Sequence, residues 1–197
     1  MNDTIRLTAL HCKDAVPKDI CHLLTHVMLR RWAMEGPRGD VQVGTALAVM
    51  PHDVYLETIQ ERLWPIVETI LGEELLPTYT YSRLYSNGDV LNRHTDRPAC
   101  EVSLTVQLGR SHHYAWPIYM GDQRFDMAEG DAVIYSGCDV LHWRDECQGP
   151  KGYYSGQAFF HFVRKNGEHA NEAGDSSKRI LPPEAFAKFR AHTMDTK

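Results

Sequence analysis

Short strand-like runs separated by turn residues fill the chain from residue 78 to residue 164. The clearest run is 100–108, where apolar residues occupy the even positions from Val102 to Leu108 and mostly polar ones lie between them. Alternation with a period of two predicts a half-buried strand, whose polar face could line a wet pocket. Many short strands closed by turns are typical of a jelly roll. The sequence therefore predicts a mainly β core of this kind.

Two helices are predicted before these strands. Residues 17–34 carry apolar side chains at helical spacing, begin at Pro17 and end near Gly36. A second apolar stripe covers residues 52–71 and ends at Gly72. The predicted architecture is therefore a β core flanked by two N-terminal helices.

The connection between the two helices is predicted to contain a strand at 41–49. Asp53 is a plausible cap for the second helix, and Pro65 is expected to kink it. His52 lies in the turn before this cap, so it is interpreted as a turn residue and not as a metal ligand.

Two histidines and one aspartate have the composition of a metal site. His94 and Asp96 form a His-x-Asp tripeptide, and residues i and i+2 of an extended strand project to the same side. His142 follows Asp96 by 142 − 96 = 46 positions, which leaves room for about four short strands. Two imidazoles and a carboxylate form the facial ligand set of non-haem Fe(II) sites that use oxygen. These three residues are the predicted metal ligands.

A His-x-Asp tripeptide alone is weak evidence, because a chain with 11 histidines contains one by chance about half of the time. The setting strengthens the prediction. Asn87-Gly88 is a signal for a type I′ hairpin turn, and it joins strand-like runs at 78–85 and 90–96. A competing zinc site, formed by Cys138, His142 and Cys147, would need a fourth ligand and a compact knuckle where the sequence predicts a strand.

The pattern around the triad resembles that of a known family. Tyr85-x2-Gly88-x2-Leu91-x2-His94-x-Asp96, then a Gly-Asp turn and strand at 130–135, then His142, is similar to the prolyl-hydroxylase-like branch of the Fe(II)/2-oxoglutarate-dependent dioxygenases. The resemblance implies a double-stranded β-helix core in which the three ligands hold Fe(II). It also implies that 2-oxoglutarate chelates the iron and that O2 is the oxidant.

The resemblance also has implications for the reaction. Relatives that transfer halide carry a small residue at the position of Asp96, so a carboxylate there implies hydroxylation of an unactivated C–H bond. 2-Oxoglutarate would be decarboxylated to succinate and CO2. Tyr81 and Tyr85, on one face of the preceding strand, resemble the tyrosines that line the co-substrate pocket in this family.

The sequence departs from the family at the residue that binds the distal carboxylate of 2-oxoglutarate. The family has an Arg or Lys there, at the start of the last core strand. By count Lys151 fits, at 151 − 142 = 9 positions after the second histidine, whereas alignment of the last strand puts Ser155 to Gln157 there. Gln157 is therefore a candidate contact, and Lys151 could equally be a solvated turn residue.

Arg144 is the other candidate for this role. It shares the strand face of His142 by the period-two rule and could offer a bidentate fork to a carboxylate. An ion pair with Asp145 or Glu146 is the plain alternative. Arg144 and Lys151 are equal candidates at this point.

A basic rim is predicted near the ligand strand, formed by Arg83, Arg93, Arg97, Arg110, His112 and His113. In a chain with a net charge of −5, such a rim favours a small anionic substrate or the carboxylate of an amino acid or peptide. The alternative is a solvated strand face with local ion pairs. Arg97, directly after Asp96, is the predicted substrate contact, and the acidic balance disfavours a nucleic acid.

The leading functional prediction is a hydroxylase that acts on a small molecule or peptide, namely a free or peptidyl amino acid. Two other classes stay open: a cupin-type metalloenzyme that does not use 2-oxoglutarate, and a non-catalytic sensor that binds a metal or a small acid. His161 is interpreted as a core histidine or as a residue that orients a metal ligand.

Residues 1–164 are predicted to form one domain, with helical support at about 17–72 and the β core at about 78–164. Residues 165–197 are predicted to form a polar linker and a short helix that contains Phe186 and Phe189. The chain is 43% hydrophobic and 24% charged, as in a globular domain. It has no apolar run of 18 residues, no signal-peptide core and no Cys-x-x-Cys pair. These features predict no membrane association, reduced cysteines and a cytoplasmic location.

Overall fold

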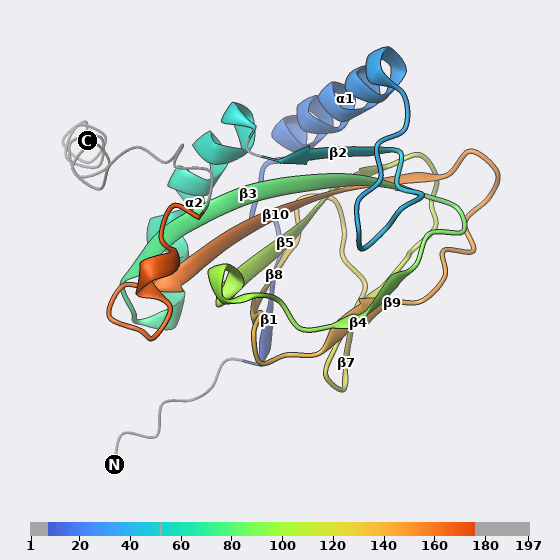
Figure 1. Cartoon of the computed structure of the whole chain (residues 1–197). Coiled ribbons are helices and arrows are strands. Elements are labelled where there is room, and N and C mark those ends of the chain that lie inside the picture. Colours follow the sequence, from blue (N-terminus) through green and yellow to red (C-terminus); the bar gives the residue numbers. More distant parts are fainter. Residues whose placement is uncertain (1–7, 52, 176–197) are drawn as a thin grey trace.

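The computed structural model describes residues 8–51 and 53–175, which form two antiparallel sheets and two long helices (Figure 1). In spatial order the larger sheet consists of β1 (Ala9–Cys12), β8 (Ala132–Ser136), β5 (Val102–Arg110), β10 (Tyr154–Arg164), β3 (Leu75–Ser86) and β2 (Ala48–Pro51). The smaller sheet consists of β4 (Leu91–His94), β9 (His142–Arg144), β6 (Ile118–Met120) and β7 (Gln123–Phe125). The two sheets lie opposite each other, as in a jelly roll (Figure 1).

The two predicted helices are confirmed. α1 (Lys18–Glu35) follows Pro17, and α2 (Val54–Leu71) ends at Gly72 in the left-handed conformation. The carboxylate of Asp53 accepts the backbone N–H of Tyr55 at 3.0 Å and so caps α2, as predicted.

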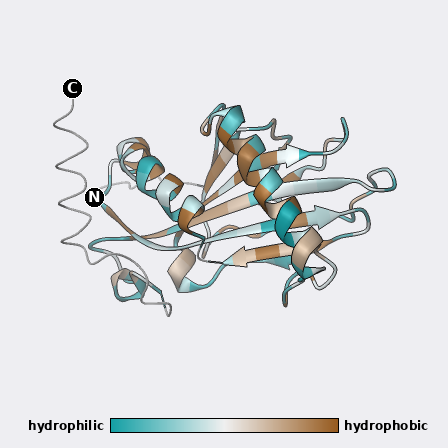
Figure 2. Cartoon of the chain, turned by 90° about the horizontal axis from the view of Figure 1, so that it is seen from above, coloured by the Kyte–Doolittle hydropathy of each residue, from teal (hydrophilic) through white to brown (hydrophobic). Residues whose placement is uncertain are grey.

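Both helices lie across one face of the larger sheet (Figure 2). Leu24 of α1 and Leu56 of α2 belong to the same buried cluster as Leu104 of β5 and Phe160 of β10. The apolar residues at alternate positions of the strands therefore face the helices, and the residues between them face the smaller sheet.

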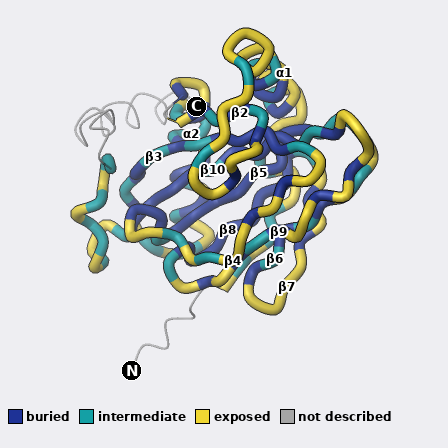
Figure 3. The backbone as a smooth tube through the Cα atoms, turned by 45° about the vertical axis from the view of Figure 1, so that its right-hand side comes forward, coloured by how far each residue is buried: buried dark blue, intermediate teal, exposed yellow. Residues whose placement is uncertain are grey.

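The second face of β5 is also buried, so the prediction of a half-buried strand was wrong. Ser103, Thr105 and Gln107 are at most 3% exposed, and Figure 3 shows β5 as buried along most of its length. They point between the two sheets and are hydrogen-bonded there to other polar side chains. The interior of the jelly roll is therefore partly polar, which suits a site for polar ligands.

The strand predicted at 41–49 was also wrong for most of its length, because β2 begins only at Ala48. Asp40 accepts the backbone N–H groups of Gln42 and Val43 at 2.9 and 2.8 Å. Such local side-chain to backbone bonds compete with strand pairing. Residues 36–47 therefore form a loop, which we call the Asp40 loop.

The predicted hairpin between β3 and β4 does not form. The chain does turn at Asn87-Gly88, where Gly88 has φ of 86°, but β3 pairs with β10 and β2 while β4 pairs with β9. The turn thus carries the chain from the larger sheet to the smaller one. The Asn-Gly signal located the turn correctly but not the strand pairing.

The segment after β10 contains a short 3-10 helix, η2 (Ala170–Glu172), and another, η1 (Pro98–Cys100), follows the His-x-Asp tripeptide. His52, the end of the predicted linker and the short helix that contains Phe186 and Phe189 lie outside the described residues. Within 8–51 and 53–175, no helix is both long enough and apolar enough to cross a membrane.

Candidate metal centre and cavity

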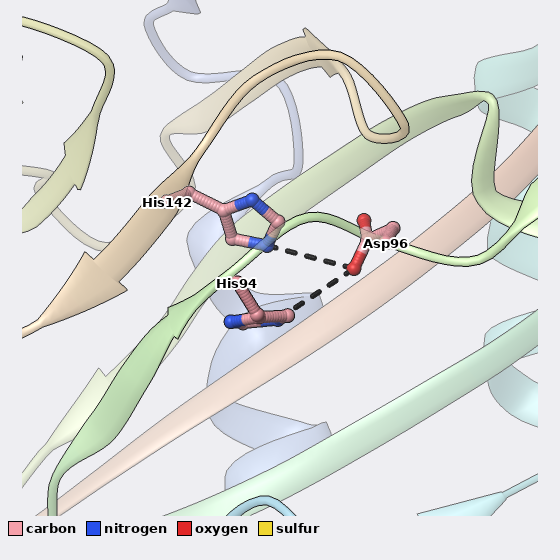
Figure 4. A group of neighbouring side chains, drawn as sticks. All are labelled: His94, Asp96 and His142. Atoms are coloured by element: carbon pink, nitrogen blue, oxygen red, sulfur yellow. Dashed lines mark ion pairs between the residues drawn. The ribbon is translucent and has the colours of Figure 1, made fainter.

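The structure brings the three predicted metal ligands together between the sheets. His94 ends β4 and His142 begins β9, and the two are register partners in the smaller sheet. The Oδ1 atom of Asp96 lies 3.7 Å from Nε2 of His94 and 3.5 Å from Nε2 of His142 (Figure 4). Four strands, β5 to β8, separate Asp96 from His142 in the chain, as the spacing predicted.

Each histidine is oriented by the backbone. Nδ1 of His94 lies 2.7 Å from the carbonyl oxygen of Asn92, and Nδ1 of His142 lies 2.9 Å from that of Val140. A carbonyl only accepts, so each Nδ1 carries the proton and each Nε2 keeps a free lone pair. Both lone pairs are thus directed toward the side on which Asp96 lies.

The charge states of the three groups also suit a cation. Burial lowers the pKa of His94, and the neighbouring His142 lowers it further. For Asp96, burial favours the neutral acid, but the proximity of His142 and of the other histidines outweighs it, so the pKa of Asp96 lies below its ordinary value. Metal ligands must be deprotonated, and this site favours a neutral His94 and an ionised Asp96.

These ligands line a cavity of about 480 Å³, which is large enough for a small ligand. The lining includes the aromatic rings of Tyr79, Tyr81 and Phe159 and two arginines, Arg83 and Arg97. The predicted zinc alternative gains no support, because Cys147 is buried in a cluster with Tyr85 and Trp116, whereas Cys138 lies beside the carbonyl of Arg97.

Arg83 was predicted to belong to a basic rim or, alternatively, to a solvated strand face, but it is only 2% exposed. Its guanidinium lies 5.1 Å from the ring centre of Tyr81 and 5.2 Å from that of Tyr85. Nε donates to the carboxylate of Asp40 at 3.1 Å, Nη1 donates to the Tyr85 hydroxyl at 2.7 Å, and Nη2 donates to the amide oxygen of Gln42 at 2.9 Å. Arg83 therefore ties the Asp40 loop to the cavity wall.

This ion pair leads to a stability prediction. Removal of one partner of a fully buried pair costs about 3–5 kcal/mol. Asp40 keeps 19% of its side chain exposed, so water can partly replace the lost carboxylate and the cost should be smaller. Asp40→Ala should lower the free energy of unfolding by about 2–3 kcal/mol, measured by urea denaturation. Asp126→Ala, which removes an exposed pair with Arg124, is the control and should change it by less than about 1 kcal/mol. Equal losses in the two variants would contradict the structural role of Asp40.

Arg97, the predicted substrate contact, also lines the cavity. Its guanidinium donates to both carboxylate oxygens of Asp175 at 2.8 and 2.7 Å, and it lies over the ring of Tyr79. The Arg97 side chain is 48% exposed. The Asp175 side chain is only 6% exposed, so this pair is half-buried, and the exposed part of the Arg97 guanidinium is what a ligand in the cavity can reach.

The predicted co-substrate residues are not all in one place. Tyr81 lines the cavity and donates its hydroxyl to Asp40, whereas Tyr85 is fully buried against Trp116 and accepts from Arg83. Gln157 is fully buried and hydrogen-bonds to Gln107 and Ser155. Lys151 is an exposed residue of the turn before β10. Neither Lys151 nor Arg144 is among the residues that line the cavity.

Arg144 lies inside the jelly roll. It is 2% exposed and is the register partner of Leu91, a residue of the cavity wall. Nη1 donates to the carbonyl of Trp116, but Nη2 is buried with no hydrogen-bond partner among the described residues. The ion pairs found in 8–51 and 53–175 do not include Arg144. Its guanidinium is therefore a buried cation that an anionic ligand could neutralise.

His161 is buried at the cavity wall, and burial lowers its pKa from 6.5 to about 4. The unfolded chain therefore binds more protons than the folded one between these values, so stability falls as the pH drops. One pKa unit corresponds to about 1.4 kcal/mol, so this group should cost the metal-free protein about 2 kcal/mol between pH 7 and pH 5. Urea denaturation at both pH values should show this loss, and His161→Asn should reduce it. An unchanged pH dependence in that variant would contradict the assignment.

Sequence reasoning missed Asp40, Gln42 and Ser103 at this site. Asp40 and Gln42 meet Arg83 from more than forty positions away, and no local pattern connects them. The polar face of the 100–108 run was the one available signal for Ser103.

No family model and no curated protein matches this chain, but many solved structures match its fold. A Pseudomonas putida prolyl-4-hydroxylase superposes with a TM-score of 0.60 at 19% identity, covering 81% of this chain and 95% of the other. The epimerase SnoN, solved with Fe3+, α-ketoglutarate and nogalamycin RO, gives 0.62 at 12% identity, covering 90% and 89%. HygX from Streptomyces hygroscopicus, solved with nickel and 2-oxoglutarate, gives 0.60 at 10% identity, covering 89% and 94%. The chain therefore has the fold of the 2-oxoglutarate-dependent Fe(II) oxygenases, which confirms the fold implied by the resemblance.

Proposed function

We propose that this chain is an Fe(II)- and 2-oxoglutarate-dependent oxygenase that hydroxylates an unactivated C–H bond. The observation that carries the proposal is the triad at the cavity. Two Nε2 lone pairs and one carboxylate oxygen face a common point, and the ligand atoms lie within 4.8 Å of one another. Two imidazoles and a carboxylate on one side of an ion leave the opposite positions for other ligands.

The donor set fits Fe(II), with His94, Asp96 and His142 holding the metal. Bound Fe(II) and 2-oxoglutarate would together supply oxygen activation, coupled to decarboxylation of 2-oxoglutarate to succinate and CO2. The chain contributes the surroundings. The carbonyls of Asn92 and Val140 fix the imidazoles, and aromatic rings line the cavity beside them.

Arg144 supports the use of a dicarboxylate co-substrate. A buried cation without an anionic partner is unfavourable, and its unpaired Nη2 could donate to the distal carboxylate of 2-oxoglutarate. Arg144 comes from β9, the strand that also carries His142. We therefore favour Arg144 over the exposed Lys151 as the anchor.

The cavity supports a small substrate or a peptide side chain, in particular a free or peptidyl amino acid. Arg83 is saturated by Asp40, Gln42 and Tyr85. Arg97 is the more exposed of the two cavity arginines, so it is the better candidate to bind a substrate carboxylate. Arg97→Ala should then lower turnover of the true substrate more than it lowers uncoupled decay of 2-oxoglutarate.

Formation of succinate from 2-oxoglutarate tests the proposal. The purified protein should form succinate in air when Fe(II) is present, and addition of single amino acids and short peptides should accelerate it for the substrate class. His94→Ala should abolish the Fe(II)-dependent part. Oxygen consumption without succinate would favour a cupin-type enzyme, and metal binding without oxygen consumption would favour a sensor.

A further inference from the structure

Asp96 has a second carboxylate oxygen, Oδ2, that does not face the histidines and is surrounded by its own donors. The hydroxyl of Ser103 lies 3.2 Å from Oδ2, and that of Tyr135 lies 3.3 Å from it. The backbone N–H of Asp96 donates to the carbonyl of Gly137 at 2.8 Å. The backbone of Asp96 is thus fixed by Gly137, and Oδ2 is fixed by the two hydroxyl groups. The other oxygen, Oδ1, points toward His94 and His142.

Gly137 leaves the room that this arrangement needs. A Cβ atom at residue 137 would lie 2.6 Å from Oδ2 of Asp96, 2.9 Å from the Ser103 hydroxyl and 2.2 Å from the carbonyl oxygen of Cys100. Any side chain there would displace the carboxylate or its donor. The packing around Oδ2 is therefore tight.

Ser103 is in turn held by His161, its register partner on β10. The Ser103 hydroxyl lies 2.9 Å from Nδ1 of His161 and 3.0 Å from the carbonyl of Cys100. Ser103 has one proton to donate, and an ionised carboxylate is a stronger acceptor than a neutral carbonyl or imidazole. Ser103 can donate its proton to Asp96 only if Nδ1 of His161 is the donor in the hydrogen bond between His161 and Ser103.

We infer that Ser103 and His161 are positioning residues for the metal ligand Asp96. The chain of hydrogen bonds runs from Nδ1–H of His161 to the Ser103 oxygen, and from the Ser103 O–H to Oδ2 of Asp96. It keeps Oδ2 occupied and so would present Oδ1 to a metal held by His94, Asp96 and His142. This inference rests on the proposed metal site.

The test measures Mn(II) affinity by calorimetry, with metal-free protein and no 2-oxoglutarate. Partners of metal ligands contribute about 10–100-fold to metal affinity, so Ser103→Ala should weaken Mn(II) binding by about tenfold or more. Thr105→Ala is the matched control, because Thr105 is the next inward-facing hydroxyl of β5 and contacts Gln157 instead. Thr105→Ala should bind Mn(II) like the unmodified protein.

Two amides at position 161 separate positioning from simple packing. An Asn side chain places its N–H near the position of Nδ1, whereas Gln places it near Nε2. His161→Asn should therefore retain most of the Mn(II) affinity, and His161→Gln should lose it. Unchanged affinity in Ser103→Ala, or equal affinities in the Asn and Gln variants, would overturn the inference. Failure of the unmodified protein to bind Mn(II) would instead count against the metal site itself.

Discussion

Arg144→Met is expected to stabilise the protein without ligands and, at the same time, to weaken 2-oxoglutarate binding strongly. Replacing a buried charged group by an apolar side chain of similar volume is often stabilising, and here we expect a gain of about 1–2 kcal/mol in the free energy of unfolding. Loss of one partner of a buried charge pair costs about 2–4 kcal/mol of binding free energy. The dissociation constant for 2-oxoglutarate should therefore rise by roughly 30- to 1000-fold.

Urea denaturation of the metal-free protein measures the first effect, and titration of 2-oxoglutarate into the Mn(II)-loaded protein measures the second. Lys151→Met is the matched control, because Lys151 is the rival anchor and lies exposed in a turn. It should change neither quantity. If Lys151→Met lost 2-oxoglutarate binding and Arg144→Met retained it, the assignment of the anchor would be reversed.

Asp96→Asn is expected to weaken metal binding by roughly a hundredfold or more. Structural zinc sites with four ligands bind with about 10–16 kcal/mol, which corresponds to about 3 kcal/mol for each ligand. The amide keeps the shape of the carboxylate and one oxygen, so the loss reports the missing negative charge. Calorimetric titration with Mn(II) measures it.

The control for this variant is Asp126→Asn, which removes the same charge from an exposed position. Asp126→Asn should leave Mn(II) affinity unchanged. Comparable affinity in Asp96→Asn and the unmodified protein would show that Asp96 is not a ligand.

The sequence was sufficient to predict the triad, because its signal is local. His94 and Asp96 are two positions apart, and the short strands between Asp96 and His142 are marked by alternation and turn residues. The helices were predictable for a similar reason, since Pro17, Asp53 and Gly72 lie at their ends. Features that depend on a few neighbouring residues could be read directly.

Features that depend on distant partners could not be predicted. Arg83 has the pattern of a solvated strand residue, and its burial depends on Asp40, 43 positions earlier. The apolar pattern at 41–49 suggested a strand, but Asp40 binds the backbone of its own loop. The positioning role of Ser103 likewise depends on His161, 58 positions later.

The choice between Arg144 and Lys151 could not be made from spacing alone. Spacing from His142 favoured Lys151, and strand periodicity favoured Arg144. The choice of the anchor depends on the path of the chain between β9 and β10, which spacing does not give. In the structure Lys151 lies in an exposed turn of that segment, whereas Arg144 lies inside the jelly roll.

Anaerobic addition of Fe(II) and 2-oxoglutarate to the metal-free protein, followed in the visible spectrum, tests the central claim most directly. Chelation of the iron by 2-oxoglutarate should produce a weak charge-transfer band. The band should be absent in His94→Ala, and Arg144→Met should need far more 2-oxoglutarate to produce it. Bound iron without such a band in the unmodified protein would contradict the proposed oxygenase.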